Sequence, residues 1–222
     1  MPAREISPSR RAVLEQVASR VPSASPSAWV LVAVDGVDGA GKSVFADELA
    51  GTLRERGRQV IRASVDGFQT PRAVRHRRGR RSPEGYWLDS FDYPRLRTDL
   101  LEPLRPGGSG RYRTASHDLA TDEALDLPWR QPPAGAVLVL DGVFLHRDAL
   151  RDRWDLSIYL DVPFPVSAAR MAARDGSPAD PDHPALARYV QAQQLYYEQC
   201  QPRLRASLVI DNTDLDNPHL LG

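Results

Sequence analysis

An apolar run followed directly by a glycine-rich loop constrains this chain more than any other feature. Residues 29–34 read WVLVAV, and residues 34–43 read VDGVDGAGKS. An apolar run of this length, ended by glycine, predicts a strand that is buried on both faces. Residues 43–56 then show an amphipathic helical pattern that ends at Gly57. This strand–loop–helix unit predicts a parallel sheet wrapped by helices.

The loop itself fits the pattern G-x-x-x-x-G-K-S/T. Its glycines let backbone N–H groups turn inward around a phosphate, and the following helix adds its dipole. Lys42 is the only lysine among 29 basic residues, and its compact ammonium suits β- and γ-phosphates better than a guanidinium fork. We expect ATP to be bound by Gly36, Asp38, Gly39, Ala40, Gly41, Lys42, Ser43 and Val44.

Strand and helix patterns alternate along the rest of the chain. Strands are predicted at 29–34, 59–65, 136–140, 156–162 and 208–210, and helices at 7–20, 43–56, 92–104, 166–174 and 186–200. Residues 21–27 read as a linker, 71–83 as a mobile loop, and 111–118 with 121–127 as a hairpin. We expect one α/β domain over 1–222, comprising an N-terminal helix and linker (1–27) and a core (28–212). About five parallel strands, a hairpin insertion and a lid after Arg174 complete this expectation.

Bulk properties narrow the class of protein. The formal net charge is +0, which gives no global attraction to nucleic acid or to a membrane. Cys200 is the only cysteine, so no internal disulfide can form. No apolar run approaches the ~20 residues of a membrane span, and the N-terminus lacks a signal-like apolar segment. We therefore expect a cytoplasmic protein that does not associate with membranes.

Carboxylates at predicted strand ends indicate phosphoryl transfer. Ser43 and Asp141, the residue after the run AVLVL, are the candidate Mg²⁺ ligands. Asp66 follows the second strand and is the candidate base for an acceptor hydroxyl; Asp35 and Asp38 are weaker candidates. Arg170 and Arg174, one helical turn apart, are candidates to stabilise the transferred phosphate.

Several segments together resemble the uridine kinase and phosphoribulokinase group of P-loop kinases, over residues 29–212. They are the loop VAVDGVDGAGKS, SVDGFQ at 64–69 and SPEGYWLDSFDYPRL at 82–96, then PGGSGRYRTASHD at 106–118, VLVLDGVF at 137–144, AARMAARD at 168–175 and RASLVIDN at 205–212. The order of Ser-x-Asp-x-Phe, Phe-Asp-x-Pro and Arg-Tyr-x-x-x-x-His is more specific than the phosphate loop alone.

The resemblance implies phosphorylation of a nucleoside 5′-hydroxyl by ATP and Mg²⁺, with uridine or cytidine as the expected acceptor. It implies that Asp66 is the catalytic carboxylate and that Asp92 binds ribose hydroxyls. Tyr112 and His117 match positions that contact the base, and Phe68 belongs to the substrate-site motif. Arg170 and Arg174 match lid residues, and Lys42 serves in catalysis. Arg188 is a candidate third lid arginine.

Two alternatives remain open. A kinase of pantothenate, glycerate or a sugar phosphate would share the same machinery, and a phosphorylated acceptor would explain the basic segment 72–81, for example through Arg75 or Arg78. A nucleotide-dependent nucleic-acid-binding protein is the second alternative, which the zero net charge disfavours. A solvated segment that becomes ordered when substrate binds would also account for residues 72–81.

Overall fold

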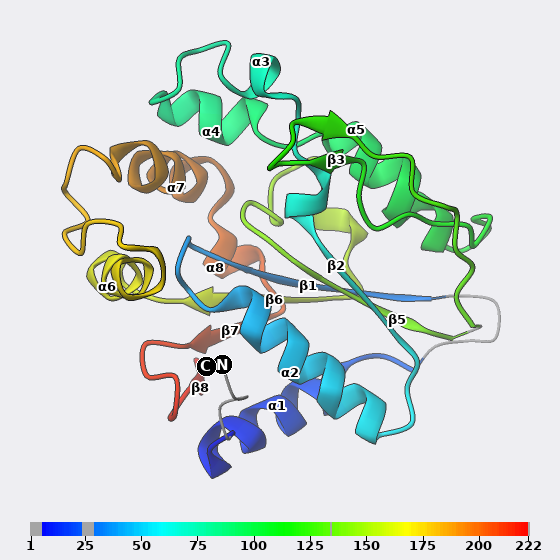
Figure 1. The fold of residues 1–222 in the computed structure, drawn as a ribbon. Helices are drawn as coiled ribbons and strands as arrows, with labels where there is room; N and C mark the ends of the chain where they lie inside the picture. The colour runs from blue at the N-terminus through cyan, green and yellow to red at the C-terminus, as the bar shows by residue number, and fades with distance from the viewer. Residues whose placement is uncertain (1–5, 24–28, 134, 222) are drawn as a thin grey trace.

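A six-stranded sheet forms the centre of the computed structural model, which describes residues 6–23, 29–133 and 135–221 (Figure 1). The strand order is β2-β5-β1-β6-β7-β8. Their bounds are β1 Val30–Gly36, β2 Val60–Ser64, β5 Val137–Asp141, β6 Leu156–Asp161, β7 Leu208–Asp211 and β8 His219–Leu221. The first five are parallel, which confirms the predicted sheet. The antiparallel edge strand β8 was not predicted, because three residues carry too little pattern.

Helices cover both faces of the sheet, because apolar residues on each strand point alternately to the two sides. Val30, Val32 and Val34 of β1 pack beneath α1 and α2, whereas Leu31 and Ala33 face the cluster that includes α4, α5 and α7. The helices are α1 Pro8–Arg20, α2 Lys42–Glu55, α4 Pro83–Asp89, α5 Tyr93–Leu96, α6 Phe164–Asp175, α7 Ala187–Cys200 and α8 Pro202–Arg205. No helix within the described ranges is long and apolar enough to cross a membrane.

The N-terminal helix α1 is present as predicted and begins after Ser7, whose side chain caps it. It packs on α2, and Arg10 forms an ion pair of 2.6 Å with Glu48. Residues 24–27 of the predicted linker lie outside the described residues. The division into a helix with linker and a core therefore stays a prediction.

The segment predicted as a mobile loop, 71–83, contains the short helix α3 (Arg72–Arg75), and α4 begins at its end. Ser82 caps α4 by accepting a hydrogen bond of 3.0 Å from the Gly85 N–H. Prolines and charges in this segment favoured a loop, but proline is also suited to the first turn of a helix, where Pro83 lies. The prediction was wrong for 72–75 and missed α4 entirely.

The predicted helix from residue 92 is irregular, and the hairpin is shorter than predicted. Asp92 caps α5, which continues as the π-helical turn Arg97–Leu101 and the 3₁₀ turn Glu102–Leu104. The hairpin consists of β3 (His117–Asp118) and β4 (Glu123–Ala124), with one further bridge between Tyr112 and Arg130. Both residues of β4 are exposed, so this strand has no buried face to extend the ladder. The remaining 3₁₀ turns are Val65–Phe68 and Arg151–Arg153.

Candidate active site

The phosphate loop joins β1 to α2 and turns at Gly36, Gly39 and Gly41, all with positive φ. A Cβ at Gly39 would lie 2.5 Å from the carbonyl oxygen of Ser167 in α6. Only glycine allows so close an approach, so Gly39, which the motif does not require, meets a packing requirement of the loop. The loop therefore reaches α2 in the conformation expected of a phosphate cradle.

Two side chains hold the loop from outside. Asn212, fully buried at the end of β7, donates a hydrogen bond of 2.8 Å to the Ala40 carbonyl. Arg170 donates to the carbonyls of Asn212 (2.8 Å) and Thr213 (2.9 Å), with a longer contact of 3.5 Å to that of Ala40. Arg170 was predicted to grip phosphate and substrate, and here its guanidinium supports the loop. We did not single out Asn212, although it lies two residues after the apolar run LVI.

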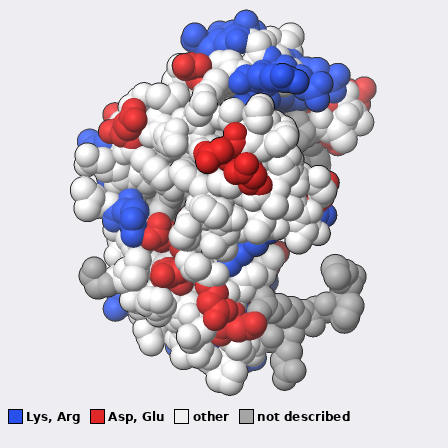
Figure 2. Space-filling model, turned by 90° about the vertical axis from the view of Figure 1, so that its left-hand side faces the viewer, with Lys and Arg blue, Asp and Glu red and all other residues white. Residues whose placement is uncertain are grey.

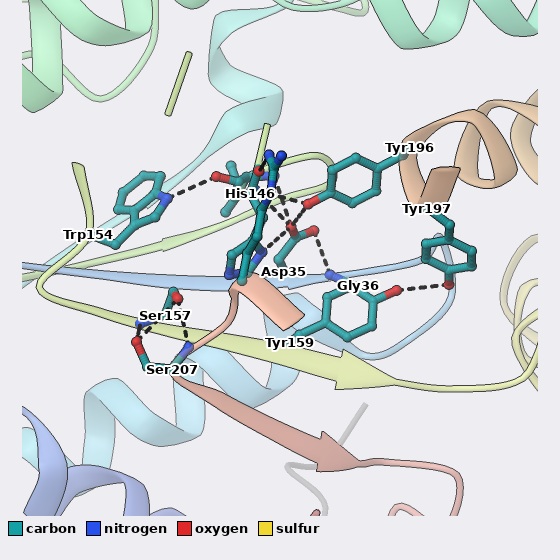
Figure 3. A network of polar contacts seen from close by, with 11 residues as sticks. Asp35, Gly36, His146, Trp154, Ser157, Tyr159, Tyr196, Tyr197 and Ser207 are labelled. Atoms are coloured by element: carbon teal, nitrogen blue, oxygen red, sulfur yellow. Dashed lines mark hydrogen bonds and ion pairs between the residues drawn. The ribbon is translucent and has the colours of Figure 1, made fainter. Parts of the chain in front are cut away.

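A buried polar network fixes the end of β1 (Figure 3). Asp35 is fully buried, and its Oδ1 accepts a hydrogen bond of 2.7 Å from the Gly36 N–H. Its Oδ2 accepts from the Leu145 N–H (2.9 Å), from Nδ1 of His146 (2.8 Å) and from the hydroxyl of Tyr196. Asp35 therefore joins the phosphate loop to the segment after β5 and to α7. Both oxygens already accept hydrogen bonds within the chain, so Asp35 positions the loop.

Ser43 and Asp141 meet as the sequence predicted. The Ser43 hydroxyl donates a hydrogen bond of 2.6 Å to Oδ2 of Asp141. Arg62, which we had not singled out, approaches Oδ1 of Asp141 to 2.9 Å without hydrogen-bond geometry. A hydroxyl beside one carboxylate is a donor set that suits Mg²⁺, which usually keeps several waters and phosphate oxygens as ligands. No cluster of three or more His, Cys, Asp or Glu side chains able to hold a metal occurs in the described part of the chain.

Asp66 lies in a 3₁₀ turn directly after β2, at the sheet edge where β1 and β5 also end. Gly142, after β5, lies against Val65: a Cβ there would meet the Val65 side chain at 2.2 Å. The Asp66 carboxylate accepts a hydrogen bond of 3.2 Å from Gln69. The Asp66 side chain is exposed to solvent, yet partial burial of the carboxylate raises its pKa. The positive charge of Lys42 lowers the pKa of Asp66, whereas the negative charges of Asp38 and Asp141 raise it. These charges act on Asp66 because all four side chains share one edge.

Asp38 lies inside the phosphate loop and contacts side chains of α4 and α7. Its Oδ1 accepts a hydrogen bond of 3.0 Å from the hydroxyl of Tyr86, and its Oδ2 a contact of 3.5 Å from Gln193. Burial, together with Asp38 and Asp66, raises the pKa of Tyr86 well above its ordinary value. Tyr86 therefore remains a hydrogen-bond donor at neutral pH. Val44 is exposed at the start of α2.

Several predicted substrate residues are buried or already have partners within the chain. Phe68 is fully buried in the apolar core, and Tyr112 and His117 are only 7% and 6% exposed. His117 contacts Asp122 at 3.1 Å, and Asp92 accepts a hydrogen bond of 2.9 Å from the Arg95 N–H. Arg174 is exposed and pairs with its neighbour Asp175 at 2.7 Å. The structure thus brings Ser43 and Asp141 together, with Asp66 at the same edge of the sheet, whereas the substrate roles of Phe68, Tyr112, His117 and Arg174 stay predictions.

A cavity of about 640 Å³ has wall residues that contact Asp66 and the phosphate loop. Its wall includes Gln69, which contacts Asp66, and Tyr86, which contacts Asp38. The rest of the wall is largely basic and is formed by Arg72, Arg75, His76, Arg80 and Arg188, with Ser90, Leu119 and Tyr189. Volumes of 300 to 1,000 Å³ are typical of small-molecule sites, and the volume of this cavity falls within that range.

Known proteins share both the sequence pattern and the fold. Residues 31–203 match the model of the Phosphoribulokinase / Uridine kinase family. A uridine kinase from Shewanella piezotolerans is 28% identical over 155 residues, which covers 66% of this chain and 68% of that protein.

Two solved structures share the fold at lower identity. A possible uridine kinase from Bacillus stearothermophilus superposes with a TM-score of 0.69 at 24% identity, over 90% of this chain and 97% of that one. A D-glycerate 3-kinase from Cryptococcus neoformans superposes with a TM-score of 0.58 at 13% identity, over 94% and 99%. With its match over most of the sequence, the chain belongs to the Phosphoribulokinase / Uridine kinase family, whose members transfer phosphate to a hydroxyl group.

Proposed function

We propose that this chain transfers the γ-phosphoryl group of ATP to a hydroxyl of a small metabolite bound in the 640 Å³ cavity. The observation that carries the proposal is the convergence of Lys42, Ser43, Asp141 and Asp66 at one sheet edge beside that cavity. Each of these groups has a distinct part in phosphoryl transfer, and together they span the donor and acceptor sides of the reaction.

The donor is held by the phosphate loop. Loop N–H groups and the N-terminus of α2 cradle the phosphates, and Lys42 neutralises charge on the transferred group. Ser43 and Asp141 would hold Mg²⁺, which when bound neutralises phosphate charge and orients the γ-phosphoryl group. Arg170 and Asn212 keep the Ala40 carbonyl turned outward, which leaves the loop N–H groups facing the nucleotide.

Asp66 acts on the acceptor. Its carboxylate accepts the proton of the acceptor hydroxyl as the oxygen attacks the γ-phosphorus and the bond to the β,γ-bridging oxygen of ATP breaks, releasing ADP. A raised pKa keeps Asp66 a better proton acceptor than an ordinary exposed aspartate. Gln69 orients the carboxylate through its 3.2 Å hydrogen bond.

The identity of the acceptor has two candidates. Similarity to the uridine kinase of Shewanella piezotolerans favours uridine or cytidine, to give UMP or CMP. The basic wall of the cavity favours an anionic acceptor such as a sugar phosphate, because arginine binds phosphate through charge-assisted hydrogen bonds.

Replacement of the proposed base tests the function. In a coupled assay of ADP release, with Mg²⁺ and a panel of uridine, cytidine, adenosine, pantothenate, glycerate and ribulose 5-phosphate, Asp66→Asn should reduce kcat by about 100- to 10,000-fold. Nucleotide affinity, measured by calorimetry, should stay close to that of the unmodified chain because Asp66 lies on the acceptor side. Near-normal turnover by Asp66→Asn would show that Asp66 is not the base.

A further inference from the structure

Arginine is abundant in this chain but seldom buried. Of the arginines in the described ranges, only Arg10 and Arg75 are buried, and Arg10 is 3% exposed. Figure 2 shows, by contrast, basic side chains gathered on the surface at the top of the molecule, over the α3–α4 region. Removing a guanidinium from water is costly unless several partners compensate its charge. The partners of Arg10 therefore indicate what this residue of α1 does.

Arg10 joins three elements of the fold. Its Nε donates a hydrogen bond of 2.6 Å to Oε2 of Glu48 in α2, and its guanidinium lies 5.5 Å from the centroid of the Phe45 ring. One Nη atom donates to Oδ1 of Asn212 at 3.0 Å and to the carbonyl oxygen of Leu215 at 3.2 Å. Both of these acceptors lie in the segment that follows β7. Arg10 therefore fastens this C-terminal segment to α1 and α2.

The segment after β7 lies directly on the phosphate loop. Nδ2 of Asn212 donates a hydrogen bond of 2.8 Å to the Ala40 carbonyl. A Cβ at Gly41 would lie 3.2 Å from the same nitrogen, so the two chain segments are in close contact. Ser7, which caps α1, donates a hydrogen bond to the carbonyl oxygen of Asp216. Helix α1 thus holds the segment through its cap as well as through its buried arginine.

The chemistry of arginine fixes the orientation of the Asn212 amide. A guanidinium can only donate hydrogen bonds, so the amide atom that faces Arg10 must be the oxygen. The amide nitrogen is then directed at the Ala40 carbonyl, which accepts its hydrogen bond. A flipped amide would place donor against donor at Arg10 and oxygen against oxygen at Ala40. Arg10 therefore selects the one orientation in which Asn212 binds the phosphate loop.

This orientation bears on the nucleotide because of peptide geometry. In a planar trans peptide, the carbonyl and the N–H of the next residue point in opposite directions. Because Asn212 holds the Ala40 carbonyl on the outer side of the loop, the Gly41 N–H is directed to the inner side. Inward N–H groups are the ones that bind phosphate in such a loop. A contact made by α1 is thereby transmitted to the phosphate cradle.

We propose that Arg10 positions the phosphate loop for ATP through Asn212, which makes α1 part of the donor site. This inference rests on the proposed kinase function and adds a positioning residue to its donor side. Residues 31–203 match the family model, so Arg10 and Asn212 both lie outside that match. Glu48 and Phe45 keep the guanidinium in place, and its contact with Asn212 carries the effect to the loop.

A double-mutant cycle tests the proposal. Calorimetry gives the dissociation constant of a non-hydrolysable ATP analogue with Mg²⁺ for the full chain, Arg10→Met, Asn212→Ala and the double variant. Each single substitution should raise this constant by about 10-fold. Because Arg10 acts through Asn212, the double variant should also show a rise of about 10-fold, in place of the ~100-fold rise that independent effects would give. In the ADP-release assay, the KM for ATP should rise in parallel while the acceptor KM stays nearly unchanged.

Arg11→Met is the matched control in the same helix. The side chain of Arg11 is 57% exposed, and its ion pair with Glu55 spans 4.0 Å. An exposed pair at this distance contributes little, so the substitution should leave both the dissociation constant and the melting temperature unchanged.

Two further variants separate positioning from stability. Glu48→Gln removes the charge that pairs with Arg10 but leaves the contact with Asn212. It should lower the melting temperature and keep the dissociation constant within about twofold of its normal value. Arg10→Lys retains a positive charge beside Glu48 but lacks the planar fork that reaches two partners at once. It should therefore keep more of the melting temperature than Arg10→Met, while the affinity for the nucleotide stays lowered; this variant also provides the test if Arg10→Met does not fold.

Other results would overturn the proposal. An unchanged dissociation constant in Arg10→Met would remove α1 from the donor site and leave the kinase function intact. Additive effects in the cycle would mean that Arg10 does not act through Asn212. Affinity that falls in proportion to the melting temperature in every variant, Glu48→Gln included, would assign Arg10 a purely structural role. Absence of nucleotide binding by the unmodified chain would overturn the proposed function together with this inference.

Discussion

On the donor side of the cleft, Asp35 is fully buried, and both of its oxygens accept hydrogen bonds from the chain itself. On the acceptor side, Arg72 and Arg80 project into a cavity with no ion-pair partner among the described residues, and the buried Arg75 lies 3.6 Å from its nearest carboxylate. Both sides hold charges at partly or fully buried positions. Only on the donor side does the protein itself supply most of the hydrogen bonds and opposite charges that compensate a buried charge.

This difference separates a prearranged site from one completed by its ligand. A phosphate loop anchored by Asp35, Asn212 and Arg170 can bind the nucleotide without first ordering its backbone. A cluster of arginines with a single neighbouring carboxylate, that of Asp122, stores repulsion that an anion relieves on binding, which favours anionic over neutral ligands. The donor side therefore suits a ligand common to many kinases, whereas the acceptor side selects one chemical class.

Lys42→Arg should have the largest effect of the changes proposed here, because the loop is built around a compact ammonium. The guanidinium is broader and planar, and it would displace either the phosphates or the loop. We expect kcat/KM for ATP to fall by about 1,000-fold or more in the ADP-release assay. Arg54→Lys, on the exposed face of α2, is the control and should retain full activity. A Lys42→Arg variant with normal turnover would remove the distinction between a prearranged donor side and an acceptor side that its ligand completes.

Asp35→Asn should destabilise the fold through the buried network. The carboxylate of Asp35 accepts hydrogen bonds from several buried donors. The NH₂ group of an asparagine would face some of these donors and leave them without an acceptor. The free energy of unfolding, from urea denaturation, should fall by about 2 to 4 kcal/mol. Asp152→Asn is the control, because its side chain is 84% exposed. An unchanged unfolding midpoint would show that the donor side is less prearranged than its hydrogen bonds indicate.

Local sequence patterns predicted the donor side well. The run WVLVAV and the glycine spacing are local signals, and the buried strand, the loop and the start of α2 follow from them within a few residues. The apolar run before Asp141 likewise predicted that this carboxylate ends a strand near the phosphate loop. Its 2.6 Å hydrogen bond with Ser43 agrees with that position. Asn212 and Arg62 were missed because their roles depend on neighbours distant in the sequence.

The acceptor side could not be predicted in the same way. Residues 72–81 contain a run of arginines, but the sequence does not show which of them face the cavity. Arg77 and Arg78 form ion pairs with Asp89, which lies beyond this segment. Arg188 reaches the cavity from α7, over 100 residues away. Tyr112 and His117 matched a family motif, yet both side chains are buried, which the motif did not predict. Spacing along the chain carries no information about such long-range partners.

The paired substitution Arg72→Gln and Arg80→Gln should have little effect on stability. Both side chains are exposed and unpaired within the described part of the chain, so the free energy of unfolding should change by no more than about 0.5 kcal/mol. Inorganic phosphate should raise the melting temperature of the unmodified chain more than that of the variant, because a ligand that binds the folded state stabilises it. Equal stabilisation of both proteins by phosphate would place the anion elsewhere.

The smallest expected effect is a change in the titration of His76, which lines the cavity. Burial lowers its pKa, and the nearby charges of Arg188, Arg75, Arg80 and Arg72 lower it further. A bound anion opposes those charges, so the pKa measured by NMR should rise by about half a unit to one unit when sulfate is added. Sulfate is the probe because it does not itself titrate in this range.

The sign of the linkage makes the result specific. If the pKa of His76 is higher in the complex than in the free protein, sulfate affinity must increase as the pH falls through the pKa of the complex, and must level off below that of the free protein. His219, 63% exposed on β8, provides an internal control in the same spectra and should not shift. An unmoved His76, or an equal shift in the Arg72 and Arg80 variant, would mean that the anion is not neutralising this cluster.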